Sequence, residues 1–246
     1  VLDDLIYPLD ARTEEPETLV LENEHLRAEF DRQSCALTSL VDKQSATELV
    51  NAQRPAVFRR IQEDDRLGMT AWTVGRYMRV ENLTEGVRLL KLERSGELRQ
   101  TLSYEVAFGV SKLTVTVWLD AGSRRLEFAV ACDWHEIGRR GEGVPQLNFL
   151  LPLAYPCQGY RYDIPFGTID RNPAPQDVPA NSWGAALPLA ADQPFLQLIT
   201  QSSYGFRGVD DALALTILRS SYDPDPYPEL GLHQFHFAVQ AAPAAS

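Results

Sequence analysis

An all-β fold, and within it a large antiparallel β-sandwich, is the fold class that the sequence predicts, on three observations. Apolar and polar side chains alternate along many short segments, as they do in strands that are buried on one face. Turns rich in glycine, proline and aspartate separate these segments, which is typical of a sandwich. No window of about twelve residues has the apolar spacing of an amphipathic helix.

The clearest alternation predicts a hairpin in the middle of the chain. In Leu126–Trp134 every second residue is large and apolar, and Lys112–Leu119 alternates in the same way. The link Asp120–Arg124 contains a glycine and has the length of a hairpin loop. The alternation places Trp134 in the core and Trp118 on the face opposite to the aliphatic side chains of its strand.

Further strands follow from the same alternation and from apolar runs bounded by turn residues. Two of them, Thr18–Glu22 and Leu26–Phe30, flank a short polar link and predict a second hairpin. The others are predicted at Leu37–Leu40, Val87–Leu92, Leu98–Phe108, Leu147–Leu153, Tyr160–Ile164, Phe195–Thr200, Leu213–Leu218 and His233–Val239. Thr47–Gln53, before Pro55, is the only segment in which we expect a short helix.

The chain is expected to form one domain, because no break in composition divides it. A length of 246 residues fits one large domain or two ordinary ones, and all-β folds often reach this size as one unit. We assign residues 1–246 to a single sandwich, with a lead-in at residues 1–18 and a tail at residues 240–246. Two proline-rich loops, Arg171–Pro179 and Asp223–Pro228, are rigid connections of the kind that carries function in a sandwich.

Charge and hydropathy argue against two classes of partner. With 23 Lys+Arg against 34 Asp+Glu, the net charge is −11, which repels the phosphate backbone of nucleic acids. The longest apolar run, Leu147–Tyr155, has the length of a strand and contains Pro152, so we expect no membrane helix. The first residues lack an initiator Met and the features of a signal peptide, and we expect a piece of a longer chain.

Cysteine usage indicates a reducing compartment, and we expect the protein to be cytoplasmic. Cys35, Cys132 and Cys157 are odd in number, lie far apart and form no C-x-x-C pair. We expect all three to be structural. Cys132, for example, lies in an apolar alternation, where a free thiol acts as a small hydrophobic side chain.

Motifs for metal binding and covalent catalysis are missing from the sequence. His233 and His236 lie three residues apart, which on a strand places their rings on opposite faces. No C-x-x-C, H-E-x-x-H, G-x-S-x-G or phosphate-binding glycine loop occurs. His135-Glu136 could act as an acid/base pair, although a strand end with a hydrogen-bonded histidine is the simpler interpretation.

Acidic pairs and tryptophans are the remaining candidates for carbohydrate chemistry. Glycosidases need two carboxyl groups at a defined separation, which the adjacent acids of Glu63-Asp64-Asp65, Asp210-Asp211 and Asp223/Asp225 do not establish. We interpret these acids as solvated surface groups. Trp72 and Trp183 lie in predicted loops, where their ring faces are available to stack on a sugar.

Three stretches form an ordered pattern over roughly residues 19 to 239. The first comprises Leu21–Asp31 and Ala36–Lys43, and the second comprises Tyr162–Arg171, Val178–Ala180 and Trp183. The third comprises Ser203–Phe206, Leu215–Ser220, Pro224–Pro226 and Gly231–Phe235. Supporting matches are Glu63-Asp64, Ala71-Trp72 and Asp133–Glu136. The pattern resembles the C-terminal β-domain of glycoside hydrolase family 38, the zinc-dependent α-mannosidases.

This resemblance implies a supersandwich of the galactose-mutarotase type and a chemistry that is located elsewhere. In the family the nucleophilic Asp, the acid/base Asp and the His/Asp zinc ligands belong to an N-terminal α/β domain, which a helical bundle joins to the β-domains. The sequence has neither pattern. The resemblance therefore implies a non-catalytic part of a retaining α-mannosidase, without a cofactor of its own. Its partners would be the catalytic and helical domains of the same polypeptide and a mannose-containing saccharide, with oligomerisation possible through the parent enzyme.

One loop carries the substrate-side residues that the resemblance implies. Leu218–Pro226 occupies the position where relatives carry an Arg and acidic residues that face the sugar. The resemblance therefore assigns this role to Arg219, Asp223 and Asp225. These side chains would form charge-assisted hydrogen bonds with mannose hydroxyls. The alternative is that Arg219 pairs internally with Asp223 or Asp225 and fixes the loop. The sequence departs from the family pattern at two positions, where Arg207 after Phe206 and Thr73 after Trp72 replace the usual acidic residues. These departures affect the substrate specificity that the loops would confer.

Two other functions remain open on the same fold. A carbohydrate-binding module would use Trp72 and Trp183 as stacking platforms. A self-sufficient enzyme of the aldose epimerase type would use His135 and Glu136 as acid and base.

Overall fold

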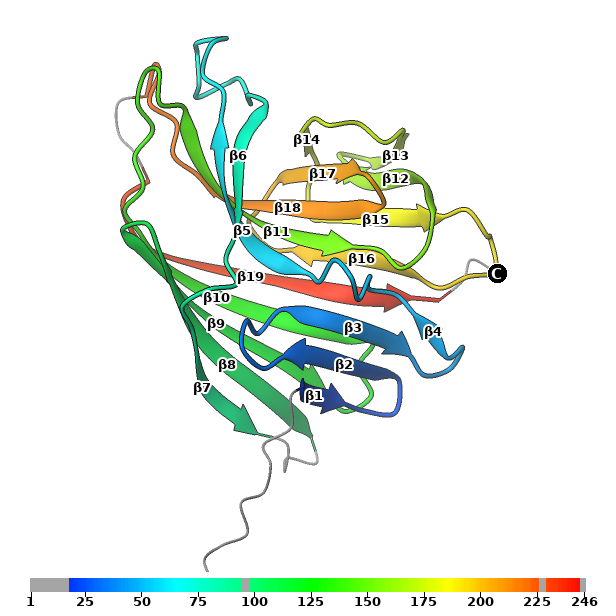
Figure 1. The fold of residues 1–246 in the computed structure, drawn as a ribbon. Coiled ribbons are helices and arrows are strands. Elements are labelled where there is room, and N and C mark those ends of the chain that lie inside the picture. Colours follow the sequence, from blue (N-terminus) through cyan, green and yellow to red (C-terminus); the bar gives the residue numbers. More distant parts are fainter. Residues whose placement is uncertain (1–17, 94–97, 226–228, 244–246) are drawn as a thin grey trace, which may run out of the picture.

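Three antiparallel sheets form the protein, as Figure 1 shows for the computed structural model. The structure describes residues 18–93, 98–225 and 229–243, and within these ranges its regular elements are all β-strands. No helix in these ranges is long and apolar enough to cross a membrane. The all-β fold class is confirmed. The expected lead-in up to residue 17, residues 226–228 of the second proline-rich loop and residues 244–246 of the expected tail lie outside the described residues.

The largest sheet has nine strands in the order β13-β12-β15-β16-β19-β10-β9-β8-β7. Its strands are β7 (Val87–Glu93), β8 (Arg99–Phe108), β9 (Ser111–Asp120), β10 (Arg125–Trp134), β12 (Cys157–Ile164), β13 (Gly167–Arg171), β15 (Trp183–Pro188), β16 (Phe195–Thr200) and β19 (Gly231–Ala242). In the middle of this sheet β19 pairs with both β10 and β16. It thereby joins the early and late halves of the chain.

Two smaller sheets complete the sandwich. The six-stranded sheet has the order β14-β17-β18-β11-β5-β6, and the four-stranded sheet has the order β1-β2-β3-β4. The six strands are β5 (Val57–Glu63), β6 (Tyr77–Asn82), β11 (Val144–Pro152), β14 (Val178–Pro179), β17 (Gly205–Val209) and β18 (Ala212–Arg219). The four strands are β1 (Thr18–Glu22), β2 (Leu26–Asp31), β3 (Leu37–Asp42) and β4 (Thr47–Glu48).

The core lies between the nine-stranded sheet and the two smaller ones. β1 contacts β8 and β9, and β18 contacts β15 and β16. Phenylalanines from both layers meet there, with ring centroids 4.8 Å apart for Phe128 and Phe237 and 5.2 Å apart for Phe58 and Phe149. Phe128 and Phe149 connect the two layers at 5.3 Å. Aromatic contacts at this distance add to the free energy gained by burying the rings.

The predicted central hairpin is confirmed. β9 and β10 pair antiparallel, with Leu119 opposite Leu126. Trp134 is fully buried. Trp118 lies on the other face of the sheet, where its ring stacks on His236 at 5.4 Å. The alternation therefore assigned both tryptophans to the correct faces.

The expected short helix at Thr47–Gln53 is wrong. Thr47 and Glu48 form β4, which pairs with β3. The Glu48 carboxylate accepts hydrogen bonds from the backbone amides of Leu40, Leu49 and Val50. These bonds hold the backbone in a non-helical path, because the amides that a helix would use bond to a side chain instead.

Other differences concern strands that alternation does not reveal. The longer strands without a counterpart in the prediction are β5, β6, β13, β15 and β17. Trp183 is the first residue of β15 rather than a loop residue, and it pairs with Ile199 of β16. At the C-terminal end, Gln240–Ala242 belong to β19 because they pair with Phe195–Gln197, so the sheet extends into the expected tail.

Candidate functional site

Three loops meet at one end of the sandwich. Figure 1 shows these loops at the top of the view, where they project beyond the end of β6. They are residues 64–76 between β5 and β6, residues 137–143 between β10 and β11, and residues 220–225 after β18. We call them the tip loops. They contain Trp72, Asp223 and Asp225, and Arg219 lies immediately before them.

Arg219 ties the tip loops to the sheet. Its Nε lies 2.9 Å from Oε1 of Glu63, and its Nη2 lies 2.9 Å from Oε2 of the same carboxylate. The remaining donors reach the carbonyl oxygens of Thr70 and Thr73 in the first tip loop. The carboxylate that pairs with Arg219 is therefore Glu63, whereas the sequence suggested Asp223 or Asp225 as its partner.

Glu63 is fully buried, which contradicts its interpretation as a solvated surface acid. Burial raises the pKa of its carboxyl group, and the Arg219 guanidinium opposes this effect. Gly75 donates its amide to Oε2 at 3.1 Å, and Gln146 donates to Oε1 at 3.0 Å. A side chain at position 75 would collide with the backbone, because a Cβ there would lie 1.8 Å from the carbonyl oxygen of Asp64. Glycine is thus required where the loop closes over Glu63.

Asp223 joins two of the tip loops. Its Oδ2 accepts a hydrogen bond from the amide of Met69 at 3.0 Å, and its carbonyl oxygen accepts one from Ala71 at 2.8 Å. Thr70 Oγ1 accepts from the amides of Tyr222 and Asp223. Asp225, two residues further on, is exposed. The structure therefore brings Arg219 and Asp223 to the same loop, residues 64–76, through different contacts.

The third tip loop is attached through Asp65. Its Oδ2 accepts a hydrogen bond from the Tyr222 hydroxyl and one from the Gly141 amide, each at 2.6 Å. These three residues come from the three different loops. The tip is consequently a cross-linked unit, in which each loop is held by side chains of the others.

Apolar side chains cover the outer part of the first tip loop. Trp72 is 68% exposed, and Leu67 and Met69 are 75% and 52% exposed. Trp183, the other predicted stacking residue, is half-buried and lies in the nine-stranded sheet, where its amide donates to Asp163. The two tryptophans thus belong to different parts of the sandwich, and Trp72 is the one in the tip loops.

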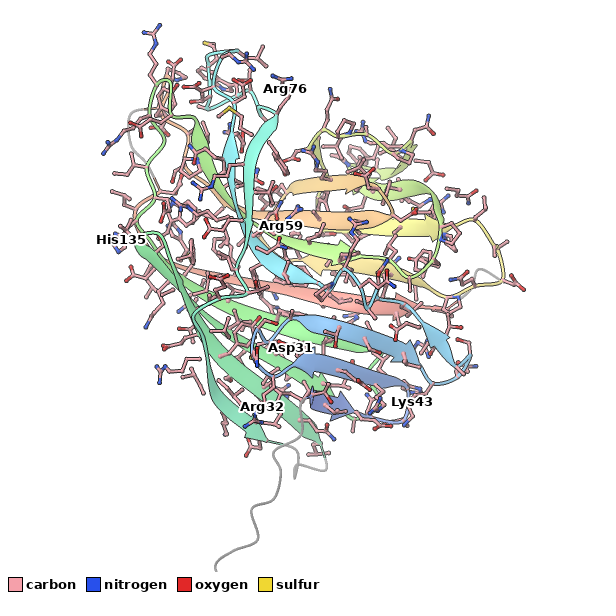
Figure 2. All side chains as sticks on the ribbon, viewed as in Figure 1. Asp31, Arg32, Lys43, Arg59, Arg76 and His135 are labelled. Atoms are coloured by element: carbon pink, nitrogen blue, oxygen red, sulfur yellow. The ribbon has the colours of Figure 1, made fainter. Side chains whose placement is uncertain are left out.

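The proposed acid/base pair of His135 and Glu136 is separated by its contacts. Glu136 is buried and accepts hydrogen bonds from Arg60, from the Val110 amide and from the Ser111 hydroxyl. The His135 ring lies at the edge of the molecule (Figure 2) and contacts Asp133 at 2.8 Å. Both residues line a cleft of ≈ 430 Å³. Glu136 is held there by several donors, an arrangement suited to a structural carboxylate.

Histidines form no metal centre in the described part of the chain. His233 pairs with buried Cys132 and His236 pairs with Ala129, so the two rings lie on opposite faces of β19, as predicted. Across residues 18–93, 98–225 and 229–243, no group of three or more His, Cys, Asp or Glu side chains is placed to hold a metal ion.

A polar network that the sequence analysis missed continues from Glu63 across the six-stranded sheet. The Tyr77 hydroxyl lies 2.9 Å from Oδ1 of Asp177 and 3.0 Å from Oε1 of Gln146. Asp177 also forms an ion pair with Arg207 at 3.2 Å. These residues come from four separate segments, and no local motif marks any of them. Only the tertiary fold brings them together.

Comparison with solved structures shows the fold. An α-mannosidase from Enterococcus faecalis is 11% identical with a TM-score of 0.71, and the alignment covers 94% of this chain and 30% of that one. A glycosyl hydrolase family 38 protein from the same organism is 12% identical with a TM-score of 0.71, covering 94% and 31% of the two chains. A galactose mutarotase-like protein from Lactobacillus casei is 14% identical with a TM-score of 0.54, covering 91% and 99%. The supersandwich that the resemblance implies is therefore confirmed.

Sequence comparison shows the family. No curated protein matches the sequence. The sequence pattern described as "Glycosyl hydrolases family 38 C-terminal domain" matches residues 21–227, which is most of the chain. The chain spans about a third of the length of the two Enterococcus faecalis proteins. It belongs to the family of glycosyl hydrolase family 38 C-terminal domains.

Proposed function

We propose that this chain is the non-catalytic β-domain of a retaining, zinc-dependent α-mannosidase, and that its tip loops border the sugar pocket of a catalytic domain upstream. The match over residues 21–227 carries the family membership. The tip supports the second part, because it offers an exposed tryptophan, Trp72, on loops that Glu63, Arg219 and Asp223 hold in place. An aromatic ring on a fixed support is suited to stacking on a sugar.

The proposal assigns the zinc ligands and both catalytic carboxylates to the upstream domain, and the whole enzyme to the cytoplasm. Arg219 has a defined role in this arrangement. Four of its contacts go to Glu63, Thr70 and Thr73, so we assign it the positioning of the loop that carries Trp72. Asp225, which is exposed, remains the candidate for direct contact with a mannose hydroxyl.

Hydrolysis of an aryl α-mannoside tests both parts of the proposal. The 246-residue chain alone should show no turnover, whereas the polypeptide extended upstream should be active. In that longer polypeptide Trp72→Ala should raise KM several-fold. Leu189→Ala, which removes an equally exposed side chain from the turn between β15 and β16, should leave KM unchanged. Turnover by the purified short chain would refute the non-catalytic assignment, and equal KM values for the two variants would refute the role of the tip.

A further inference from the structure

A small cavity away from the tip loops is lined by three arginines. It has a volume of ≈ 170 Å³, and Arg54, Arg59 and Arg207 line it together with Tyr77 and Asp210. Figure 2 labels Arg59 near the middle of the molecule. Such a concentration of guanidinium groups is unexpected in a chain with a net charge of −11. Three positive side chains and one negative one, that of Asp210, therefore line the cavity.

Arg59 is partly buried and belongs to β5. Its Nε donates to Oδ1 of Asn148 at 2.9 Å, and this amide carries no charge. Within the described ranges Arg59 forms no ion pair with a carboxylate, although the charge of Asp177 acts on it, and Arg59 lines the cavity. Burial, together with repulsion from Arg207 and Arg54, lowers the pKa of Arg59 to about 10, although Tyr77 and the Asp177 carboxylate act in the opposite direction. The group stays protonated near neutral pH, and a bound anion would relieve the cost of burying it.

Arg207 and Arg54 each use only some of their N–H donors in contacts with the protein. Arg207 lies with its guanidinium carbon 3.9 Å from the centre of the Tyr77 ring, and its Nη1 contacts Asp177 at 3.2 Å. Arg54 donates Nη1 to the backbone carbonyl of Asp210 at 3.1 Å. Only Arg207 has a carboxylate partner among the three. The Tyr77 ring, the Asp210 carbonyl group and the Asn148 amide therefore hold the three guanidinium groups through uncharged contacts, and the Asp177 carboxylate compensates Arg207.

We propose that this cavity binds the phosphate group of a small molecule, either free phosphate or a phosphate monoester. A guanidinium fork matches two phosphate oxygens at once, and an anion would pair with Arg54 and Arg59, which form no ion pair within the described residues. The volume accommodates several water-sized groups. Two carboxylates oppose an anion there: Asp210 lines the cavity, and Asp177 contacts its lining residues Tyr77 and Arg207. The cavity shares no lining residue with the tip loops, although Tyr77 follows loop 64–76 directly, and phosphate binding does not depend on the proposed role in mannoside hydrolysis.

Calorimetric titration of the 246-residue chain at low ionic strength tests the proposal with three probes, namely inorganic phosphate, mannose 6-phosphate and mannose. Inorganic phosphate and mannose 6-phosphate should both bind if the cavity recognises the phosphate group alone. Only mannose 6-phosphate should bind if the cavity also contacts the sugar. Mannose should give no binding heat. Binding of mannose as tight as that of its phosphate, or no binding of either phosphate compound at millimolar concentration, would overturn the proposal.

Variants separate this site from a general surface effect. Arg54→Gln, at an exposed position, should weaken phosphate binding about tenfold, and Arg207→Gln should weaken it at least as much. Asp210→Asn should strengthen binding, and asparagine tolerates the backbone φ of 54° at this position. Arg161→Gln removes an exposed arginine from the nine-stranded sheet and should change nothing. Equal affinities for the Arg54 and Arg161 variants would refute the assignment.

Discussion

Arg219 and Glu63 form a buried bidentate ion pair, with Nε–Oε1 and Nη2–Oε2 distances of 2.9 Å each. The two residues lie 156 positions apart in the sequence, at the ends of β18 and β5. The Arg219 side chain is 16% exposed and that of Glu63 is not exposed. The pair therefore determines where the tip loops lie relative to the six-stranded sheet.

Breaking this pair should be costly. Arg219→Met would leave Glu63 buried without a cation, and such a change destabilises proteins by about 3–5 kcal/mol. Urea unfolding at neutral pH measures the loss. The double variant Glu63→Gln/Arg219→Met should be more stable than Arg219→Met alone, because no uncompensated charge remains. Arg161→Ala, which removes an exposed ion pair with Asp170, should cost less than about 1 kcal/mol. If Arg219→Met lowered the free energy of unfolding no more than Arg161→Ala does, the buried pair would not be important for stability.

The aromatic core should respond to truncation more strongly than the surface. Phe149 is 2% exposed and contacts Phe58, Phe128 and Phe237. Phe149→Ala should lower the free energy of unfolding by about 3–5 kcal/mol, because it removes contacts from both layers and leaves a cavity. Leu98→Ala, at a position that is 79% exposed, should cost less than about 0.5 kcal/mol. Comparable denaturant midpoints for the two variants would show that the layers do not pack as described.

Acid should weaken the segment that leads into β15, through Asp163. Its carboxylate accepts hydrogen bonds from the amides of Asn181, Ser182 and Trp183, and from the Ser182 hydroxyl. Partial burial acts to raise the pKa of Asp163, but these bonds outweigh it and lower the pKa below the usual value. The group therefore adds stability above its unfolded pKa of about 3.9, and this stability is lost as the pH falls through its lower folded pKa.

Asp163→Asn tests this contribution. The variant should be less stable than the parent chain by about 1 kcal/mol at neutral pH, since a charged acceptor of several bonds becomes a neutral one. Unfolding free energies measured from about pH 6 down to about pH 2 should converge for the two proteins as the carboxylate is protonated. A difference between them that stays constant with pH would show that the charge of Asp163 plays no part.

The fold was predictable where one face of a strand is apolar and the other is solvated. In β9 and β10 this contrast gives strict alternation, and the faces of Trp118 and Trp134 follow from it. In β5 the contrast is lost, because Arg59 and Arg60 are adjacent and each has a partner on a different face. Arg59 bonds to Asn148 and Arg60 to Glu136. A strand with polar groups on both faces has no period that sequence reasoning can detect.

The candidate site was predictable only in part, for a related reason. The family pattern located Arg219, Asp223 and Trp72 in the chain. The partner of Arg219 could not be found, since Glu63 belongs to a run of acids that looks like a solvated loop. Its burial arises from the closure of loop 64–76 over it, in which Gly75 approaches the backbone of Asp64. This arrangement depends on tertiary contacts between β5 and β18, which leave no local signal.

Two of the three thiols should be unreactive in the folded protein, and the third, that of the partly buried Cys157, should react only slowly. Burial raises the pKa of Cys35 and that of Cys132 to about 12, so neither forms a thiolate near neutral pH. Burial also raises the pKa of Cys157, although this side chain is only partly buried. Ellman's reagent at about pH 8 should therefore find one slowly reacting thiol in the native chain. All 3 cysteines should react once urea unfolds it.

Cys157→Ser identifies the slow thiol. This variant should lose the native-state reaction and keep the two thiols that appear on unfolding, with little change in stability because serine retains a small polar group near the Gly159 carbonyl. Cys132→Ser should leave the native reaction unchanged. It should, however, lower the free energy of unfolding, because it introduces a hydroxyl at a fully buried position. A fast native reaction that persists in Cys157→Ser would mean that the core around Cys35 or Cys132 opens readily, in conflict with their complete or nearly complete burial.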